Sequence, residues 1–419
     1  MGSFSFIHAA DLHIGSPFKG VSAESQELGE YFQKSTFRAF QALVDACLVH
    51  EVDFLLVAGD VYDGSDRSLG AQLTFNDGLR RLADAGVQTF VVHGNHDPLD
   101  GRVSQLEVPE GVTTFGRAAQ NTTVEVQGEI VAAISGISFP TRDVRSNLAR
   151  TLEPGPAGVF RIGLLHCNVG ADTGHEPYAP CELSELKASD MDYWALGHVH
   201  TRKVLSEEPM IVYPGNPQGR SIREQGARGC FLVRVDSQSR AELEFLPLDV
   251  VRWHEIPVSI EGLSTVDALD RKLGETLEAH SISAGGRGIV CRLKVEGRGP
   301  IYRDLHVEGA EEELLSRLRD RFAGSNPLVW AQRIELNCRP EVDLAERAKR
   351  GDLLAEVITV ARGHADTPEG LAQLKAAALD ELWENGRAKK ALAELDQDKI
   401  REIVAEAELL CLDLLEDQA

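Results

Sequence analysis

The sequence has little of several features that would assign it to a specialised class of protein. Its 419 residues contain no apolar run near the roughly 18 residues that a membrane-spanning helix needs. The seven cysteines are scattered and form no Cys-x-x-Cys pair, which argues against a disulfide framework and against a thiolate zinc site. Basic residues are also scarce, since 43 Lys and Arg against 66 Asp and Glu give a formal net charge of −23. Overall charge therefore does not attract this chain to nucleic acid, and any DNA binding must use local basic patches or a partner.

The remaining composition is that of an ordinary soluble globular protein, with 43% hydrophobic and 26% charged residues. A chain of this length is expected to form two or three domains. Its apolar start is interrupted by His8 and Asp11, and no basic residue precedes them, so no secretory signal is expected. Together with the scattered cysteines, this predicts a cytoplasmic protein.

Three regions with different patterns are expected, at 1–250, 251–340 and 341–419. The first alternates short apolar strands with helices at about 31–50 and 69–86, which predicts an α/β sandwich with helices covering the sheets. The second predicts a β-α-β-α-β module, in which Ser264 and Asp267 resemble a capping box at the start of the first helix. The third region is predicted to be helical, with a helix start at Thr367-Pro368-Glu369. Its helices either pack back on their own domains or form a docking surface for a partner.

Five apolar runs are each followed by side chains of the kinds that bind metal ions. Short apolar runs with β-branched residues, bounded by Gly or Asp, are typical of buried strands. Ligand sites in open sheets collect where the chain leaves the carboxyl ends of such strands, so we expect these five ends to meet. In chain order, the polar segments are Asp11-Leu12-His13, Gly59-Asp60, Gly94-Asn95-His96-Asp97, His166 and Gly197-His198-Val199-His200.

The ligand types favour a pair of divalent cations. Two such ions about 3.5–4 Å apart are a common means of cleaving phosphate esters. One oxygen ligand must then bridge them, and Asp60 suits this role because it follows Gly59 at a strand end, where close approach is allowed. Imidazoles and a carboxamide would fill the remaining positions. Nitrogen and oxygen ligands without sulfur fit manganese, iron or zinc.

These segments, with Asp63 in Gly59-Asp60-Val61-Tyr62-Asp63, resemble the full signature of the calcineurin-like metallophosphoesterases, and the resemblance extends to about Val235. It implies a metallophosphoesterase β-sandwich flanked by helices. The pattern after residue 250 adds the expectation of a small α/β capping domain and a helical C-terminal tail. It also implies two divalent metal ions, with Mn²⁺ expected first and iron or zinc as the alternatives.

The resemblance further implies a role for each polar side chain. One metal would be held by Asp11, His13, Asp60 and His200, and the other by Asp60, Asn95, His166 and His198. A hydroxide bridging the metals would attack phosphorus in line, and His96 would protonate the leaving oxygen. Asp63 falls where the family often places a residue that orients this histidine, and a carboxylate there would favour the charged imidazole.

A narrower resemblance concerns the DNA repair exonucleases typified by the nuclease subunit of the bacterial SbcCD complex. Residues 7–15 and 59–63 carry it, and 213–220 with Gly229-Cys230-Phe231 are most similar to the YhaO-type branch of that group. The resemblance implies a metal-dependent exonuclease or endonuclease that acts on DNA and works with a coiled-coil ATPase of the SbcC or YhaN kind. It also implies a homodimer through the helices of the N-terminal domain. Asp63 departs from the archaeal and eukaryotic break-repair nucleases, which usually have histidine there.

The substrate is indicated less closely by the residues themselves. Arg220 and Arg223 are the candidates for binding substrate phosphates, with Arg228, Arg142 and Arg145 as further residues of a groove. The alternative is that these are solvated loop arginines. The acidic net charge favours a phosphodiesterase or phosphatase acting on a small nucleotide or another small phosphoester, whereas the added module and tail favour DNA. A scaffold that has lost its metals is a third alternative, but such a protein should have damaged ligands, and none is damaged here.

Overall fold

The computed structural model describes residues 2–16, 26–64, 68–101, 106–170, 176–379 and 397–416. The chain divides into two compact units. The first comprises residues 1–259, 265–296 and 304–337, and the second comprises 260–264, 297–303 and 338–419. The predicted three-part division at residues 250 and 340 stays a prediction.

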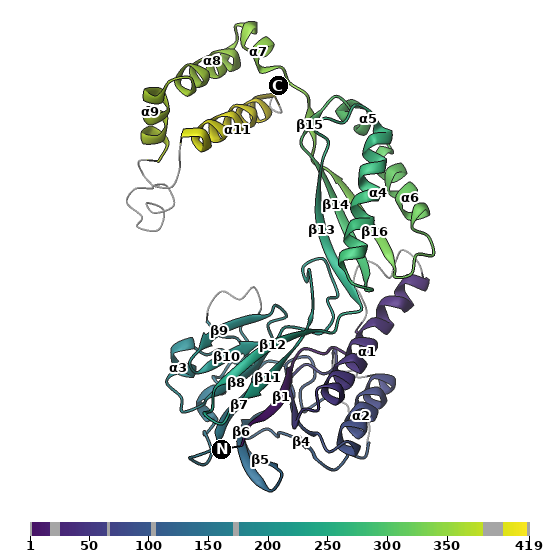
Figure 1. Ribbon diagram of the computed structural model, residues 1–419, viewed down its shortest axis with the longest axis vertical. Coiled ribbons are helices and arrows are strands. Elements are labelled where there is room, and N and C mark those ends of the chain that lie inside the picture. Colours follow the sequence, from purple (N-terminus) through teal and green to yellow (C-terminus); the bar gives the residue numbers. More distant parts are fainter. Residues whose placement is uncertain are drawn as a thin grey trace. The chain divides into compact units, whose positions relative to one another are not determined.

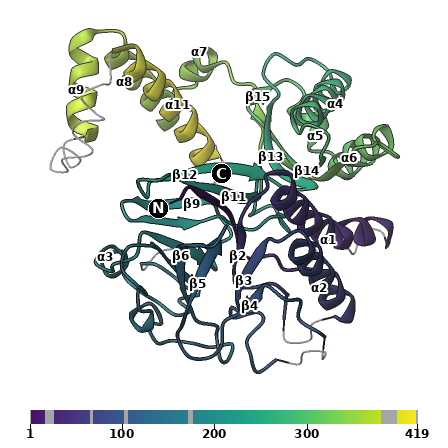
Figure 2. The same cartoon turned by 60° about the horizontal axis from the view of Figure 1, so that its bottom comes forward.

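The N-terminal part of the first unit is built on two six-stranded sheets (Figures 1 and 2). The first sheet, in spatial order, contains β12 (Ala241–Pro247), β11 (Gly229–Val235), β1 (Phe4–Ala9), β2 (Phe54–Ala58), β3 (Gln88–Val92) and β4 (Val112–Thr114). The second contains β5 (Gln120–Val126), β6 (Glu129–Gly136), β7 (Phe160–His166), β8 (Tyr193–Gly197), β10 (Met210–Tyr213) and β9 (Lys203–Glu207). Strands β1 to β4 are parallel, and so are β6, β7, β8 and β10. Within each sheet, the carboxyl ends of these strands therefore lie at one edge.

Aromatic residues fill the space between the two sheets. Phe6 of β1 stacks on Phe54 of β2 with ring centroids 4.8 Å apart, and it meets the edge of Tyr193 from β8 at 5.2 Å. All three rings are fully buried. Trp194, whose side chain points to the other face of β8, is also buried, and its indole N–H donates to the carbonyl of Leu186 at 3.2 Å. Successive side chains of β8 point to opposite faces of the sheet, so Tyr193 packs into the core between the sheets and Trp194 into the layer on the outer face.

Helices cover the outer faces of the sandwich. Helices α1 (Gln26–Val49) and α2 (Leu69–Asp84) lie side by side over the first sheet (Figure 1), and α3 (Leu183–Lys187) belongs to the second. The two predicted long helices are confirmed, but α1 begins at Gln26 and not near Tyr31. Its first turns carry Leu28 and Phe32, which pack against Trp253 far along the chain. The mixed α/β sandwich predicted from the strand and helix pattern is confirmed.

The α/β module has the predicted β-α-β-α-β order. It consists of β13 (Val251–Ser259), α4 (Val266–Ser283), β14 (Gly288–Glu296), α6 (Ala310–Arg321) and β16 (Val329–Leu336), with a short helix α5 (Tyr302–Leu305) before α6. Its strands are parallel in the order β13-β14-β16. The expected cap at Ser264 is wrong by one residue. The side chain of Thr265 accepts the N–H of Ala268 at 3.2 Å, because Thr265, with an extended backbone, is the residue that directly precedes α4.

The second unit is mainly helical. It contains α7 (Leu344–Arg347), α8 (Leu353–Ala365), α9 (Pro368–Leu379) and α11 (Gln397–Glu416), with two short strands, β15 (Arg298–Gly299) and β17 (Arg339–Pro340). The predicted start at Thr367-Pro368 is confirmed, since the Thr367 hydroxyl accepts the N–H of Gly370 at 3.1 Å. Leu354, Ile358 and Leu412 form a small core between α8 and α11. Among the described residues, no helix has the length and apolar character needed to cross a membrane.

Candidate metal centre

The five strand ends meet as predicted. Asp11 and His13 follow β1, Asp60 follows β2, Asn95 and His96 follow β3, His166 ends β7, and His198 and His200 follow β8. Within this group, ligand atoms of Asp11, His13 and His200 lie within 4.8 Å of one another, and so do those of Asp11, Asp60 and His166. Both sheets therefore contribute side chains to one buried cluster of oxygen and nitrogen atoms.

The first predicted metal position has donors that lie close together, and two of them, Asp11 and His13, are buried. The Nε2 atoms of His13 and His200 are 3.3 Å apart, and Nε2 of His200 lies 3.8 Å from Oδ1 of Asp11. The carboxylate of Asp11 also accepts the backbone N–H of His198 at 3.1 Å, which joins the loops after β1 and β8.

The second predicted position lies beside it. Nε2 of His166 is 3.0 Å from Oδ1 of Asn95 and 3.5 Å from Oδ2 of Asp60. That same Asp60 oxygen is 3.8 Å from Nε2 of His13, so it faces donors of both positions, as a bridging carboxylate must. The ring of His198 lies against that of His166 at 5.3 Å between centroids, and its Nε2 atom is 2.8 Å from the carbonyl oxygen of Glu176.

The backbone at these loops is strained. Four of the predicted ligands have positive φ: Asp11 at 53°, His13 at 44°, Asp60 at 51° and His198 at 102°. Residues other than glycine rarely adopt positive φ, and each such residue costs on the order of 1–3 kcal/mol of folding free energy. Such strained residues persist only where the surrounding structure fixes their conformation. Here, four of them belong to the cluster.

Two glycines make room for the cluster. A Cβ atom on Gly59, whose φ is 91°, would lie 2.3 Å from Nδ1 of His166. A Cβ atom on Gly94 would lie 2.3 Å from Oδ1 of Asp60. Both distances are far below van der Waals contact, so the Gly-Asp and Gly-Asn-His-Asp segments need glycine at these places because imidazole and carboxylate occupy the space.

The electrostatics of the cluster fit a bound cation. Burial, together with the neighbouring Asp60, raises the pKa of Asp11 well above its usual value. Burial and the nearby charge of Arg220 hold the pKa of His13 well below its usual value, so its imidazole is neutral and able to bind a metal. Buried carboxylates without a compensating charge are costly, and a divalent cation supplies that charge. The donor set of carboxylate, carboxamide and neutral imidazole therefore fits divalent metal ions.

His96 stands beside the cluster and is paired with Asp63. Nδ1 of His96 lies 2.8 Å from Oδ1 of Asp63. Burial opposes the charged imidazole, but the hydrogen bond to Asp63 and the charge of Asp60 outweigh it and raise the pKa of His96. The pKa of Asp63 is lowered in spite of its burial by hydrogen bonds from His96 and Ser16. With 34% of its side chain exposed, His96 is within reach of a substrate.

The candidate substrate arginines differ in their surroundings. Arg220 approaches the His96 pair, with Nη1 donating to the Ser16 hydroxyl at 2.9 Å and lying 3.4 Å from Oδ2 of Asp63. Arg223 is exposed, as are Arg142 and Arg145. The prediction that Arg228 lines a groove is wrong. Only 7% of Arg228 is exposed, because its guanidinium donates to the backbone carbonyl of His200 and to Oδ1 of Asn216.

Sequence reasoning missed two carboxylates that support the cluster. Glu224 lies 2.6 Å from Nδ1 of His200, and the pKa of Glu224 falls to about 2, because its hydrogen bond with His200 and the charge of Arg220 outweigh the effect of burial. Asp97 ends the Gly94-Asn95-His96-Asp97 segment, and the sequence predicts no role for it. Its carboxylate accepts the N–H groups of Gly94 at 2.7 Å and Val61 at 2.9 Å. The segment Gly94-Asn95-His96-Asp97 is typical of a tight turn, and this signal could have indicated the role of Asp97. No local pattern marks Glu224, which follows Arg223 directly in the sequence.

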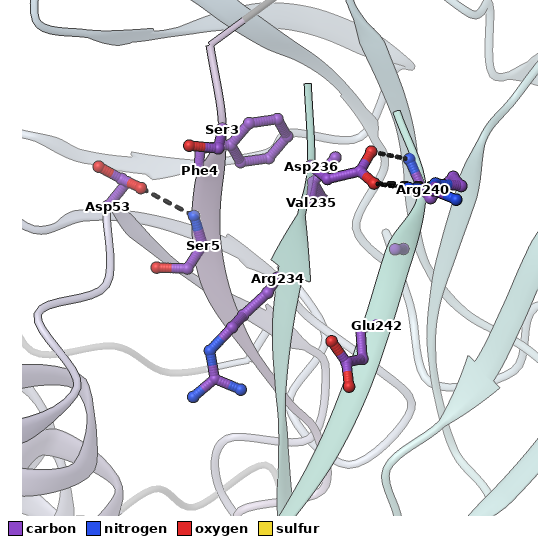
Figure 3. A pocket seen from close by; sticks show the side chains of 10 residues that line it. Ser3, Phe4, Ser5, Asp53, Arg234, Val235, Asp236, Arg240 and Glu242 are labelled. Atoms are coloured by element: carbon purple, nitrogen blue, oxygen red, sulfur yellow. Dashed lines mark hydrogen bonds and ion pairs between the residues drawn. The ribbon is translucent and has the colours of Figure 1, made fainter. Parts of the chain in front are cut away.

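A cavity lies at the opposite end of the parallel strands from the cluster. Figure 3 shows this space of about 670 Å³ at the start of β1 and the end of β11. Several of its charged groups have local partners: Arg240 donates to Asp236 at 2.8 Å, and Asp53 accepts the N–H of Ser5 at 2.8 Å. The predicted ligands do not line it, so the strand-end cluster remains the candidate functional site.

Comparison with known proteins agrees with this site. The family model of the calcineurin-like phosphoesterases matches residues 4–202, and that of the middle domain of the metallophosphoesterase YhaO matches residues 253–339. The uncharacterized metallophosphoesterase YhaO of Bacillus subtilis is 35% identical over 342 residues, which cover 81% of this chain and 83% of that protein. The chain belongs to the calcineurin-like metallophosphoesterase family. The predicted resemblance is confirmed, and the chain is a hydrolase of phosphoesters from a family that uses divalent metals.

Two other relatives of this metallophosphoesterase carry the names of nucleases or repair proteins. The DNA double-strand break repair protein Mre11 of Sulfurisphaera tokodaii is 25% identical, covering 55% of this chain and 57% of that protein. The SbcD protein of the SbcCD nuclease from Rhodobacter capsulatus is 38% identical over 109 residues, which are 25% of this chain and 24% of that protein. The chain is thus similar to proteins of the DNA repair exonuclease group.

Proposed function

We propose that this metallophosphoesterase hydrolyses phosphodiester bonds in DNA with two divalent metal ions, Mn²⁺ being the expected metal. The observation that carries the proposal is the paired cluster at the strand ends, in which Asp60 faces donors of both positions. Asp11, His13 and His200 would hold one ion, and Asn95, His166 and His198 the other. Bound ions would supply an activated water near neutral pH and positive charge against the growing charge on the phosphate oxygens.

The chain's own groups would handle the leaving oxygen. His96 is exposed enough to reach substrate, and the carboxylate of Asp63 favours its protonated form. A protonated imidazole at this place would donate its Nε2 proton to the departing oxygen of the sugar. Asp63 would keep the ring oriented, and Ser16 supports Asp63 by donating its hydroxyl to Oδ2 at 2.7 Å. Arg220, beside this pair, would bind a phosphate oxygen of the substrate, and the exposed Arg223 would bind a phosphate further along the strand.

A small phosphoester is the alternative substrate, and one observation favours it. The formal net charge of −23 repels a polyanion at long range, whereas a mononucleotide or cyclic nucleotide carries little charge to repel. DNA is favoured by the similarity to Mre11 and to SbcD of the SbcCD nuclease. A coiled-coil ATPase of the SbcC or YhaN kind, a homodimer through the N-terminal helices and a cytoplasmic location complete the proposal.

Nuclease and diesterase assays on one preparation test this function. The metal-free full chain would be reconstituted with Mn²⁺ and given end-labelled linear duplex DNA, single-stranded DNA and bis-p-nitrophenyl phosphate. A His96→Ala variant serves to exclude a contaminating nuclease. We expect DNA cleavage that requires Mn²⁺ and falls strongly in the variant. Cleavage of the chromogenic diester without any cleavage of DNA, with or without an added ATPase partner, would contradict the DNA substrate and favour the small phosphoester.

A further inference from the structure

Glu224 lies between its own loop, residues 214–228, and the predicted metal ligand His200. Its Oε1 atom is 2.6 Å from Nδ1 of His200. Its Oε2 atom accepts hydrogen bonds from Nδ2 of Asn216 at 3.1 Å and from the backbone N–H of Arg220 at 2.6 Å. Only 14% of the side chain is exposed. The carboxylate is therefore held from its own loop and directed at one imidazole.

A carboxylate at this distance determines which nitrogen of His200 carries the proton. An imidazole that donates Nδ1–H to an oxygen leaves Nε2 unprotonated, with its lone pair free to bind a metal. Nε2 of His200 is the atom that faces His13 at 3.3 Å and Asp11 at 3.8 Å. Histidines that bind metals commonly donate their other nitrogen to such a partner, which orients the ring and raises its basicity.

We propose that Glu224 is a positioning residue that sets the tautomer and orientation of His200 and thereby the affinity of the first metal position. The inference rests on the two-metal site proposed above. In the second position, Nδ1 of His166 faces the uncharged backbone carbonyl of Ala58 at 3.0 Å. Nδ1 of His200 thus contacts a charged carboxylate oxygen, whereas Nδ1 of His166 contacts an uncharged carbonyl oxygen. Removing the charge at Glu224 should therefore weaken one position and leave the other unchanged.

The loop that carries Glu224 is anchored to the first strand of the α/β module. The indole N–H of Trp253 donates to the carbonyl of Gly219 at 3.0 Å, and the backbone N–H of Glu255 donates to the side chain of Gln225 at 3.1 Å. Packing is close here, since a Cβ atom on Gly219 would lie 2.6 Å from the backbone oxygen of Glu224. Strand β13 thus fixes the loop from one side, and the carboxylate of Glu224 acts on His200 from the other.

Calorimetric titration of the metal-free full chain with Mn²⁺ alone tests the inference. The wild type should bind two ions. Glu224→Gln should bind one ion with an affinity within twofold of the wild type and the other about 10- to 100-fold more weakly. Glu185→Gln is the matched control, because Glu185 also accepts several hydrogen bonds, from Asn147 at 2.7 Å, Arg150 at 2.7 Å and the backbone of Glu182 at 2.9 Å, but contacts no predicted ligand. The control should bind both ions as the wild type does.

A double-mutant cycle separates positioning from general support of the fold. In a His200→Gln background, Glu224→Gln should change the Mn²⁺ affinities by less than about twofold, because the imidazole through which Glu224 acts is already absent. An equal loss in both backgrounds would overturn the inference. Glu224→Asp keeps the charge, but its side chain is one methylene shorter and holds the carboxylate farther from His200. This variant should therefore also bind Mn²⁺ more weakly at the first metal position. Wild-type affinities at both positions in the Gln and Asp variants would also overturn it.

These titrations use no DNA, so failure of this inference is distinguishable from failure of the proposed function. A wild type that binds two ions and shows the Glu224 effect but cleaves no DNA would contradict the DNA substrate alone. A wild type that cleaves DNA while Glu224→Gln binds both ions normally would contradict the role of Glu224 alone.

Discussion

Nδ1 of His96 lies 2.8 Å from Oδ1 of Asp63, and this contact pairs a partly exposed imidazole with a carboxylate at the edge of the predicted metal cluster. The other oxygen of Asp63 accepts the Ser16 hydroxyl at 2.7 Å, so the carboxylate is fixed on two sides. Neither His96 nor Asp63 is needed as a ligand in the proposed two-metal site. The proposed acid can therefore be altered without removing a metal ligand.

The loss of kcat caused by His96→Ala should depend on the leaving group of the substrate. On DNA, we expect kcat to fall by about 10²–10⁴, because the departing sugar oxygen needs a proton. On bis-p-nitrophenyl phosphate, the loss should be below about tenfold, since a p-nitrophenolate ion leaves readily without one. Steady-state kinetics on both substrates at one Mn²⁺ concentration measure the two losses. Equal losses on the two substrates would argue against His96 as the acid.

Gly59 and Gly64 offer a matched pair of substitutions. Their φ angles are 91° and 94°, but a Cβ atom on Gly59 would collide with the ring of His166, whereas one on Gly64 would meet nothing within 4 Å. Gly64→Ala should cost only the backbone strain, about 1–2 kcal/mol of the free energy of unfolding. Gly59→Ala should cost more and should also abolish Mn²⁺ binding at the position that includes His166. Denaturant unfolding and Mn²⁺ titration of both variants check this, and normal metal binding by Gly59→Ala would refute it.

Arg220 and Arg223 should differ in their effects on DNA cleavage. Arg220 lies 3.4 Å from Oδ2 of Asp63, so Arg220→Ala should lower kcat/KM by about 10- to 100-fold through lost hydrogen bonds to charged groups. Arg223 is exposed, and Arg223→Ala should weaken binding uniformly across DNA sequences and reduce the salt slope by about one. Cleavage rates and DNA affinity at several salt concentrations measure both effects. A larger loss of kcat/KM in Arg223→Ala than in Arg220→Ala would contradict this ranking.

The stability of the α/β module should depend on pH through His254. Its ring lies 5.5 Å from that of His280, and burial followed by the charges of His280 and Arg252 lowers the pKa of His254 below its usual 6.5. The fold thus favours the neutral ring, so this stability is fully present above about pH 6.5 and is lost as the pH falls below it. Between pH 7 and pH 5, the Tm should fall less in His254→Gln than in the wild type by calorimetry. His50→Gln, at an exposed histidine, is the control and should follow the wild type.

The predicted ligands could be found from the sequence because each is placed by a local rule. Asp11, Asp60 and His166 stand at the ends of apolar strands, and parallel strands bring their carboxyl ends to one edge. The glycines before Asp60 and Asn95 mark the same places, since the close approach of His166 and Asp60 excludes a side chain there. At these positions, the sequence pattern and the packing in the structure therefore indicate the same residues.

The remaining features depend on contacts between distant segments, which a local pattern does not contain. The role of Glu224 follows from the path of its loop beside β13, and that path brings it to His200, 24 residues away in sequence. Arg228 was expected at the surface but is buried, because the same loop turns its guanidinium onto the backbone carbonyl of His200. The early start of α1 has a similar cause, since Leu28 in its first turn belongs to the same buried cluster as Trp253.

Anomalous diffraction from crystals of the full chain grown with Mn²⁺ tests the two-metal site most directly. Two anomalous peaks are predicted, one against Asp11, His13 and His200 and the other against Asn95, His166 and His198, with the Asp60 carboxylate touching both ions. A single peak, or two peaks that do not share Asp60, would contradict the account.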